Sequence, residues 1–279
     1  MKGENIDLEK KSITLNNGYN MPRLGLGTWQ LNGKMAERTI YNAIRTGYRL
    51  IDTALIYENE ENVGIAVRKA IEDGIVTRKE LFITTKLLAS GFLDYKKAID
   101  DCNNRLGLQY IDLMLIHQQG KSEQELCKAV ECKIDQGIIK SFGISNYYTN
   151  EDFNRIIKYS AIYPTVIQNE NHIFFNNSDF KKYVSKYGTI IQSYYPFGGR
   201  GHISESFNNE TIRELAEKYR KTPSQIILRW QLQSGYVSVF GCSKEEHLIE
   251  NMNIFDFNLG KEDIKKINKL NSSVRYENW

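Results

Sequence analysis

Two kinds of segment alternate along most of the chain. Short apolar runs, which are typical of buried strands, are separated by longer segments in which apolar residues recur every three or four positions, as in amphipathic helices. Several helical segments end in Gly, the residue that most often closes a helix. The strand-like runs are LGLGTW, RLIDTA, LFITTKL, YIDLMLIH, IKSFGIS, PTVIQNE, TIIQSYYP and VSVFG. This pattern predicts an α/β fold in which helices join parallel strands.

The number of strand-like runs indicates how the sheet is arranged. Eight parallel strands close a (β/α)8 TIM barrel, which takes about 250 residues as a single unit, and this chain has 279. Two small domains would also fit that length, but no linker composition divides the chain, so we expect one domain over residues 1–279. A doubly wound open sheet is the alternative, although it needs fewer strands.

Segments outside the eight repeats predict additional elements. Two short strands around Asn16-Asn17-Gly18 predict an N-terminal β-hairpin. Between the last two strand-like runs there are two helical stretches, ETIRELAEKYR and PSQIILRWQLQ, where one is needed. KEDIKKINKL is a further amphipathic segment near the end of the sequence. The sequence therefore predicts a barrel with an N-terminal β-hairpin and two extra helices.

Composition and charge narrow the class of protein. The net charge of +3 is small, and no cluster of Lys and Arg interleaved with aromatic residues suggests a nucleic-acid surface. No signal peptide is expected, and no run approaches the roughly 20 apolar residues that span a bilayer, so we expect a cytoplasmic protein without a membrane partner. The cysteines form no CxxC pair and the histidines show no metal-binding spacing, so we expect reduced thiols and no metal.

Four residues with chemically useful side chains lie at or just beyond the ends of three successive strand-like runs: Asp52, Tyr57, Lys86 and His117. Because crossover helices bring the C-terminal ends of parallel strands to one face, we expect these side chains to meet there. Each alone has an ordinary explanation, as a turn cap, a surface aromatic, a solvated lysine or a core histidine. Their coincidence favours one active site for proton-coupled hydride transfer.

The chain resembles the aldo-keto reductases over nearly its whole length. The shared patterns, in the order of that family, are LGLGTW, GYRLIDTALIYENEENVG, FITTKL, YIDLMLIH, IIKSFGISNY, TPSQIILRWQLQ and IENMNIFDFNL. It is most similar to the bacterial reductases related to diketogluconate reductases, in which Gln follows the position of His117 in place of Trp. The resemblance implies a barrel enzyme that binds NADP in extended form and reduces a small-molecule carbonyl substrate without a metal. We expect a monomer, although the sequence leaves the oligomeric state open.

The resemblance also implies roles for the strand-end residues. Tyr57 would be the general acid, and Lys86 would favour its anion. Asp52 would hold Lys86, and His117 would hydrogen-bond the substrate carbonyl and orient it. Because a free phenol has a pKa of about 10, we expect the charge of Lys86 to bring the pKa of Tyr57 towards neutral pH.

A further set of residues is implied to bind the cofactor: Thr28, Ser145, Asn146, Gln168, Tyr194, Ser243, Lys244, His247, Glu250 and Asn251. Ser145, Asn146 and Gln168 would hold the carboxamide edge of the nicotinamide. Tyr194 would stack on the nicotinamide ring, although an aromatic residue there could equally serve packing. Glu250 and Asn251 would meet the adenine, where a pair on a helix surface is the simpler interpretation without the resemblance.

The residues beside His117 depart from the family pattern. Gln118 and Gln119 stand where many members have Trp-Pro. We therefore expect a more polar pocket, which suits a small hydroxylated or oxo substrate better than a steroid. Trp29 still offers an apolar wall, so Trp29 and Gln118 are the expected substrate-binding residues.

A second departure concerns the ribose phosphate that distinguishes NADPH from NADH. Gly241, Cys242 and His247 stand where many members carry Lys, Ser and Arg, so the usual cationic clamp is missing. Ser243 and Lys244 could replace it at the start of the last barrel helix, since a helix start attracts phosphate. Lys244 could equally be a solvated lysine. We expect NADPH to be preferred, with NADH possible.

The sequence favours an NADPH-dependent oxidoreductase that reduces small aldehydes, ketones or keto-sugars to alcohols. One alternative is a sensor or regulatory protein that binds the nicotinamide cofactor but turns over little, which the intact four-residue set argues against. Another is a barrel lyase or isomerase that uses Lys86 as a Schiff base, which the neighbouring Asp52 and Tyr57 disfavour.

Overall fold

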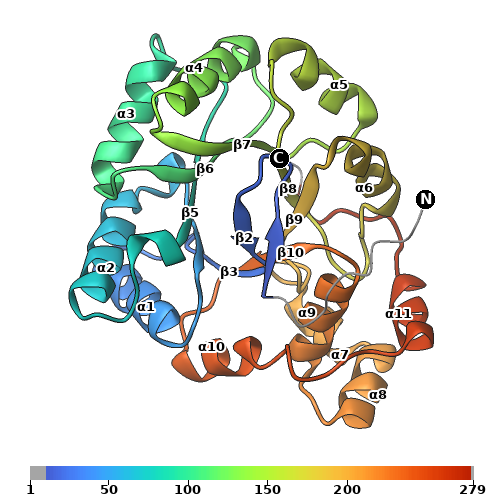
Figure 1. Cartoon of the computed structure of the whole chain (residues 1–279). Coiled ribbons are helices and arrows are strands. Elements are labelled where there is room, and N and C mark those ends of the chain that lie inside the picture. Colours follow the sequence, from blue (N-terminus) through green and yellow to red (C-terminus); the bar gives the residue numbers. More distant parts are fainter. Residues whose placement is uncertain (1–10, 278–279) are drawn as a thin grey trace.

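A closed barrel of eight parallel strands forms the centre of the molecule (Figure 1). The computed structural model describes residues 11–277. The strands follow the order β10-β3-β4-β5-β6-β7-β8-β9 around the barrel. Their bounds are β3 (Leu24–Gly27), β4 (Leu50–Asp52), β5 (Phe82–Leu87), β6 (Ile111–Ile116), β7 (Ile139–Ser145), β8 (Val166–Glu170), β9 (Ile190–Tyr194) and β10 (Val237–Phe240). The predicted (β/α)8 TIM barrel is confirmed, and the open sheet is excluded.

The predicted hairpin is also confirmed. Strands β1 (Ser12–Thr14) and β2 (Asn20–Pro22) pair in antiparallel fashion. The amide of Asn16 donates to the backbone oxygens of Pro164 and Tyr187, which lie just before β8 and β9. The hairpin therefore lies against the N-terminal ends of the barrel strands and closes that end of the barrel.

Helices surround the barrel. They are α1 (Gly33–Arg45), α2 (Glu60–Glu72), α3 (Tyr95–Leu106), α4 (Glu123–Asp135), α5 (Asn150–Tyr159), α6 (Ser178–Val184), α7 (Ile203–Asn208), α8 (Glu210–Tyr219), α9 (Pro223–Gln233), α10 (Glu245–Met252) and α11 (Lys261–Asn268). Helix α9 packs on β10, whereas α8 packs on α9 from outside, so α8 and α11 are the two predicted extra helices and α7 is a third. The six-residue α7 was not predicted, because fewer than two helical turns are too short to show a recurring apolar spacing.

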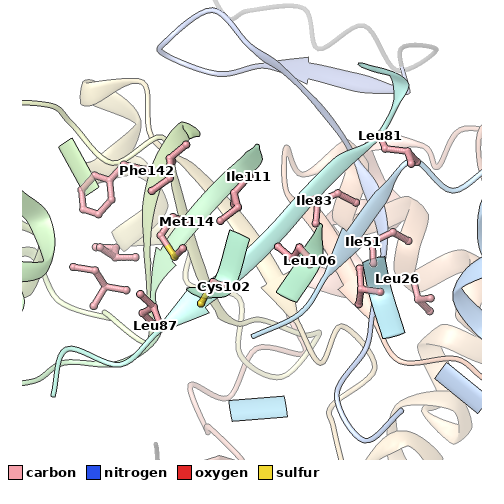
Figure 2. Close-up of a cluster of buried hydrophobic side chains, with 14 of the residues drawn as sticks. Leu26, Ile51, Leu81, Ile83, Leu87, Cys102, Leu106, Ile111, Met114 and Phe142 are labelled. Atoms are coloured by element: carbon pink, nitrogen blue, oxygen red, sulfur yellow. The ribbon is translucent and has the colours of Figure 1, made fainter. Parts of the chain in front are cut away.

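Side chains alternate between two cores along each strand, as the pleat requires. Along β4, Leu50 points into the barrel and Ile51 points outward to the helices. The outer core includes Ile83, Met114 and Leu106, which Figure 2 shows between the strands and the helix layer. Because the period is two, Asp52 shares the inward direction of Leu50. The alternation thus directs the polar side chains at the strand ends into the barrel.

Two further findings concern the described residues. Within residues 11–277, no helix is long and apolar enough to cross a membrane. The same part of the chain contains no group of three or more His, Cys, Asp and Glu side chains that could hold a metal ion. All four cysteines are free.

One close approach between helices generates a test of the packing. A Cβ on Gly64 of α2 would lie 2.0 Å from the backbone oxygen of Leu106 at the end of α3. Gly64→Ala should therefore lower the free energy of unfolding by about 1–3 kcal/mol, even though Ala is the better helix former. Urea denaturation measures the change. Glu72→Ala, at an exposed position of the same helix, is the control and should stay within about 0.5 kcal/mol of the unmodified protein. A Gly64→Ala variant as stable as the control would contradict the packing.

Candidate active site

A cavity of about 310 Å³ opens at the C-terminal ends of the barrel strands. Residues at the ends of seven strands or just beyond them line it, from Gly27 at the end of β3 to Gly241 after β10. Of the residues singled out in the sequence, the cavity wall includes Trp29, Asp52, Tyr57, His117, Gln118, Ser145, Asn146, Gln168 and Tyr194. The predicted convergence of catalytic, substrate-binding and nicotinamide-binding residues on one face is therefore present, with Lys86 buried beneath.

The loop after β4 is fixed by a buried asparagine. Asn59 donates from its amide to the backbone oxygens of Thr28 and Leu31, both at 2.8 Å, and accepts from the Thr53 hydroxyl at 2.5 Å. The 3₁₀ turn Leu55–Tyr57 lies between these anchors, so the position of Tyr57 is set by the loop. The sequence analysis did not single out Asn59, whose partners are backbone groups of a neighbouring loop.

Lys86 is the centre of the polar cluster. Its side chain is fully buried on β5, and its Nζ lies 2.5 Å from Oδ1 of Asp52. The same Nζ donates to the backbone oxygen of Thr53 at 2.8 Å and lies 3.3 Å from the hydroxyl of Tyr57. The ammonium group thus has one charged and two neutral partners, which satisfies its three donors.

Burial and neighbouring charges have opposite effects on the pKa values of Lys86 and Tyr57. Burial alone would lower the pKa of the Lys86 ammonium, but Asp52, and to a lesser extent Tyr57, hold it above its usual value. Burial raises the pKa of the Tyr57 phenol, and the nearby Lys86 charge lowers it without reversing the change. The expectation that Lys86 brings the pKa of Tyr57 towards neutral pH is therefore contradicted. Burial, which sequence cannot quantify, outweighs the lysine.

His117 lies beside Tyr57, with ring centroids 5.7 Å apart. Burial, with a smaller effect of Lys86, lowers the pKa of His117 to about 3, so the ring is neutral at neutral pH. Its Nδ1 is buried and has no hydrogen-bond partner within residues 11–277. Trp29 contacts Tyr57 from another direction, with ring centroids 4.8 Å apart. Aromatic rings thus flank the Tyr57 phenol.

Amide side chains form the adjoining part of the wall. Gln168 donates from Nε2 to Oδ2 of Asp52 at 2.7 Å and to Oε1 of Gln192 at 2.9 Å. Asn146 donates to the backbone oxygen of His117 at 2.9 Å, and its Oδ1 accepts from the Tyr194 hydroxyl at 2.7 Å. The predicted nicotinamide-binding residues are therefore joined to the catalytic cluster by hydrogen bonds.

The residues predicted for the adenosine end lie apart from the cavity wall. Ser243, Lys244 and His247 are exposed around the start of α10. The Glu250 carboxylate accepts from the hydroxyls of Thr222 and Ser224 at the start of α9, at 2.9 Å each. Glu250 is therefore already engaged by the protein.

Two other predicted positions are buried. Asn251 is 5% exposed, and Thr28 donates to the backbone oxygen of Asp52 at 3.0 Å. Thr28 supports the floor of the site and is absent from the cavity wall.

The structure adds Arg200 to the candidate site. It lines the cavity, and its guanidinium carbon lies 5.5 Å from the ring centroid of Trp29. Tyr195 and Ile203 also line the cavity. The run YYPFGGRG, which begins with the last residue of β9, was the signal in the sequence for these residues, because loops after barrel strands face the site. The path of the loop could not be predicted from the pattern.

Comparisons with known proteins agree with this geometry. The model of the Aldo/keto reductase family matches residues 23–272. The chain is 38% identical to the glyoxal reductase of Bacillus subtilis, over 95% of each chain. It is 33% identical to the NADPH-dependent D-xylose reductase of Meyerozyma guilliermondii, over 96% of each chain. The crystal structure of an aldo-keto reductase of Bombyx mori in complex with NADP superimposes with a TM-score of 0.87 at 30% identity, covering 96% of this chain and 94% of that one.

The depressed pKa of His117 generates a test of the electrostatics. The unfolded chain takes up a proton at this residue below a pH of about 6.5, whereas the folded chain does so only near pH 3. Stability from this group is thus present above pH 6.5 and is lost as the pH falls towards 3. His117→Asn should remove about 2 kcal/mol of the fall in the free energy of unfolding between pH 7 and pH 5.

Urea denaturation of both proteins at the two pH values measures this difference. His247→Asn, at an exposed position, is the matched control and should keep the pH dependence of the unmodified protein. An unchanged pH dependence in His117→Asn would show that His117 is not held neutral by its surroundings.

Proposed function

We propose, since this chain belongs to the aldo/keto reductase family, that it uses a reduced nicotinamide dinucleotide to convert small aldehydes, ketones or keto-sugars into alcohols. The observation that carries the proposal is the Asp52–Lys86–Tyr57 cluster beside neutral His117, at the wall of the cavity. A proton donor, a charge that favours its anion and a hydrogen-bonding ring are thus assembled where a carbonyl group can enter.

The bound cofactor would supply hydride to the carbonyl carbon. Tyr57 is protonated at neutral pH, because burial raises its pKa, and it would give its proton to the carbonyl oxygen. The Lys86 ammonium, 3.3 Å away, would stabilise the phenolate left behind. His117 would hydrogen-bond the same carbonyl oxygen and orient it. Asp52 would keep Lys86 charged and in place.

The cavity wall fits a nicotinamide. A carboxamide needs both donors and acceptors, and Ser145, Asn146 and Gln168 supply hydroxyl and amide groups at the ends of β7 and β8. Tyr194 closes the same region with an aromatic ring. These side chains would bind and orient the cofactor, with Tyr194 against the ring.

Substrate size and polarity follow from the rest of the wall. Trp29, Ile56 and Ile203 make it mainly apolar, and Gln118 adds an amide beside His117. The expected extra polarity is thus confined to the part of the wall near His117, where the Gln118 amide would bind a hydroxyl or oxo group of a small carbonyl substrate. The relatives named for glyoxal and D-xylose also act on small carbonyl compounds.

The first test removes the proposed acid. Tyr57→Phe keeps the ring and its contact with Trp29 but loses the hydroxyl, so turnover should fall by about 10²-fold or more while cofactor binding survives. Nicotinamide absorbance, with NADPH and a panel of aldehydes, dicarbonyls and keto-sugars, measures turnover. Tyr163→Phe, at an exposed ring elsewhere, is the control and should remain fully active. Near-normal turnover in Tyr57→Phe would exclude Tyr57 as the acid.

The second test addresses cofactor choice. We expect a modest preference for NADPH, with Lys244 at the start of α10 binding the ribose phosphate. Lys244→Ala should then raise the Michaelis constant for NADPH and leave that for NADH nearly unchanged. Lys269→Ala, at an exposed position after α11, is the control and should affect neither. Equal effects of Lys244→Ala on both cofactors would rule out the phosphate role, and a clear preference of the unmodified protein for NADH would overturn the cofactor assignment.

A further inference from the structure

The segment 275–277 is held by a buried carboxylate. Glu170, at the end of β8, has a fully buried side chain. Its two oxygens accept from the backbone N–H groups of Tyr276 at 2.7 Å and Glu277 at 3.1 Å. The ring of His172 lies 2.9 Å from the same carboxylate. The last described residues are therefore fixed against the barrel face that carries the cavity.

Tyr276 joins this anchor to a loop of the cavity. Its ring stacks in parallel on His172, with centroids 4.7 Å apart and planes 5° apart. It also stacks on His202, with centroids 3.6 Å apart and planes 4° apart. The Tyr276 hydroxyl lies 3.2 Å from the carboxylate of Glu205. Tyr276 is thus an aromatic bridge between the end of β8 and residues 202–205.

The loop that His202 ends is rich in glycine. Gly198, Gly199 and Gly201 all have positive φ, between 71° and 92°, so the chain depends on glycine there. Glycine has no side chain that could anchor the loop. Gly199 and Arg200 line the cavity, and Arg200 reaches Trp29. The stack of His202 on Tyr276 therefore adds a side-chain anchor to a glycine-rich stretch of the cavity wall.

The position of this loop indicates what lies beneath it. On one side the wall continues to Tyr194, the proposed partner of the nicotinamide ring, and on the other to Gly241, which leads to the proposed phosphate site at Lys244. A molecule that spans both places has to pass the loop 198–202. The segment 275–277 also contacts the region around Tyr194. The Arg275 guanidinium carbon lies 3.8 Å from the ring centroid of Tyr148. The Tyr148 hydroxyl in turn lies 3.0 Å from the Tyr194 hydroxyl.

We propose that Tyr276 is a positioning residue, which holds the loop 198–202 over the bound nicotinamide dinucleotide and slows its release. The inference rests on the proposed function, because it requires the cofactor to bind in this cavity. Loss of the stack leaves the reacting groups untouched and loosens the wall over the cofactor. Affinity for the cofactor then falls, while turnover at saturating cofactor is retained.

The experiment measures NADPH dissociation constants and release rates from NADPH fluorescence, together with steady-state kinetics, in the whole chain. Tyr276→Ala should raise the dissociation constant roughly 2- to 10-fold, the range expected for one lost aromatic pair, through faster release. Tyr276→Phe keeps the stack and should stay close to the unmodified protein. His202→Ala should match Tyr276→Ala, and the double variant should exceed neither, because both remove the same contact.

Tyr163→Ala is the matched control, since it removes a ring that packs on Tyr187 with centroids 5.2 Å apart, away from the cavity. It should leave cofactor release unchanged. If Tyr276→Ala does not fold, His202→Ala carries the test alone, because its side chain is 39% exposed. A purely structural role would lower the melting temperature without changing cofactor release.

Three results would overturn the inference and leave the proposed function standing. They are unchanged cofactor release in both alanine variants, an equal loss in Tyr276→Phe, and a higher Michaelis constant for the carbonyl substrate alone. Failure of the unmodified protein to bind either NADPH or NADH would instead overturn the proposed function, and this inference with it.

Discussion

The buried charge of Lys86 is the constraint on which the site depends. An ammonium group without solvent is tolerated inside a protein only when a paired charge and hydrogen-bond acceptors replace its water. Asp52 supplies the charge, and the Asp52 carboxylate then accepts from Gln168 on β8. Strands β4 and β8 stand four strands apart around the barrel. The ion pair of Lys86 with Asp52 and the hydrogen bond from Gln168 therefore connect opposite walls of the cavity.

Burial, together with this charge, governs the protonation of its neighbours. Burial lowers the pKa of His117, and the positive charge of Lys86 acts in the same direction. Tyr57 keeps its proton because it is buried, although Lys86 reduces the free energy needed to release it. In the mechanism that we propose, the transferred proton therefore comes from the tyrosine, and the neutral histidine would hydrogen-bond the substrate.

Most of the architecture could be predicted from the sequence, because it follows from local periodicity. The alternation of strand and helix patterns fixed the number and order of the barrel strands, and the pleat then directed Asp52 and Lys86 inward. The missed features depend on contacts between residues far apart in the chain. Asn59 acts on a loop 28 to 31 residues earlier, and Glu170 holds residues more than 100 positions later. No local pattern encodes such partners, and burial, which decides the pKa of Tyr57, is equally non-local.

The N-terminal hairpin has a consequence for proton supply. It lies across one end of the barrel, and the interior above it is filled by apolar side chains such as Leu50, Phe82 and Leu113. The cavity that reaches Tyr57 lies at the opposite end of the barrel. A proton that Tyr57 gives up, as we propose, would therefore return from solvent on the cavity side. Renewal of the acid would then follow the departure of the product.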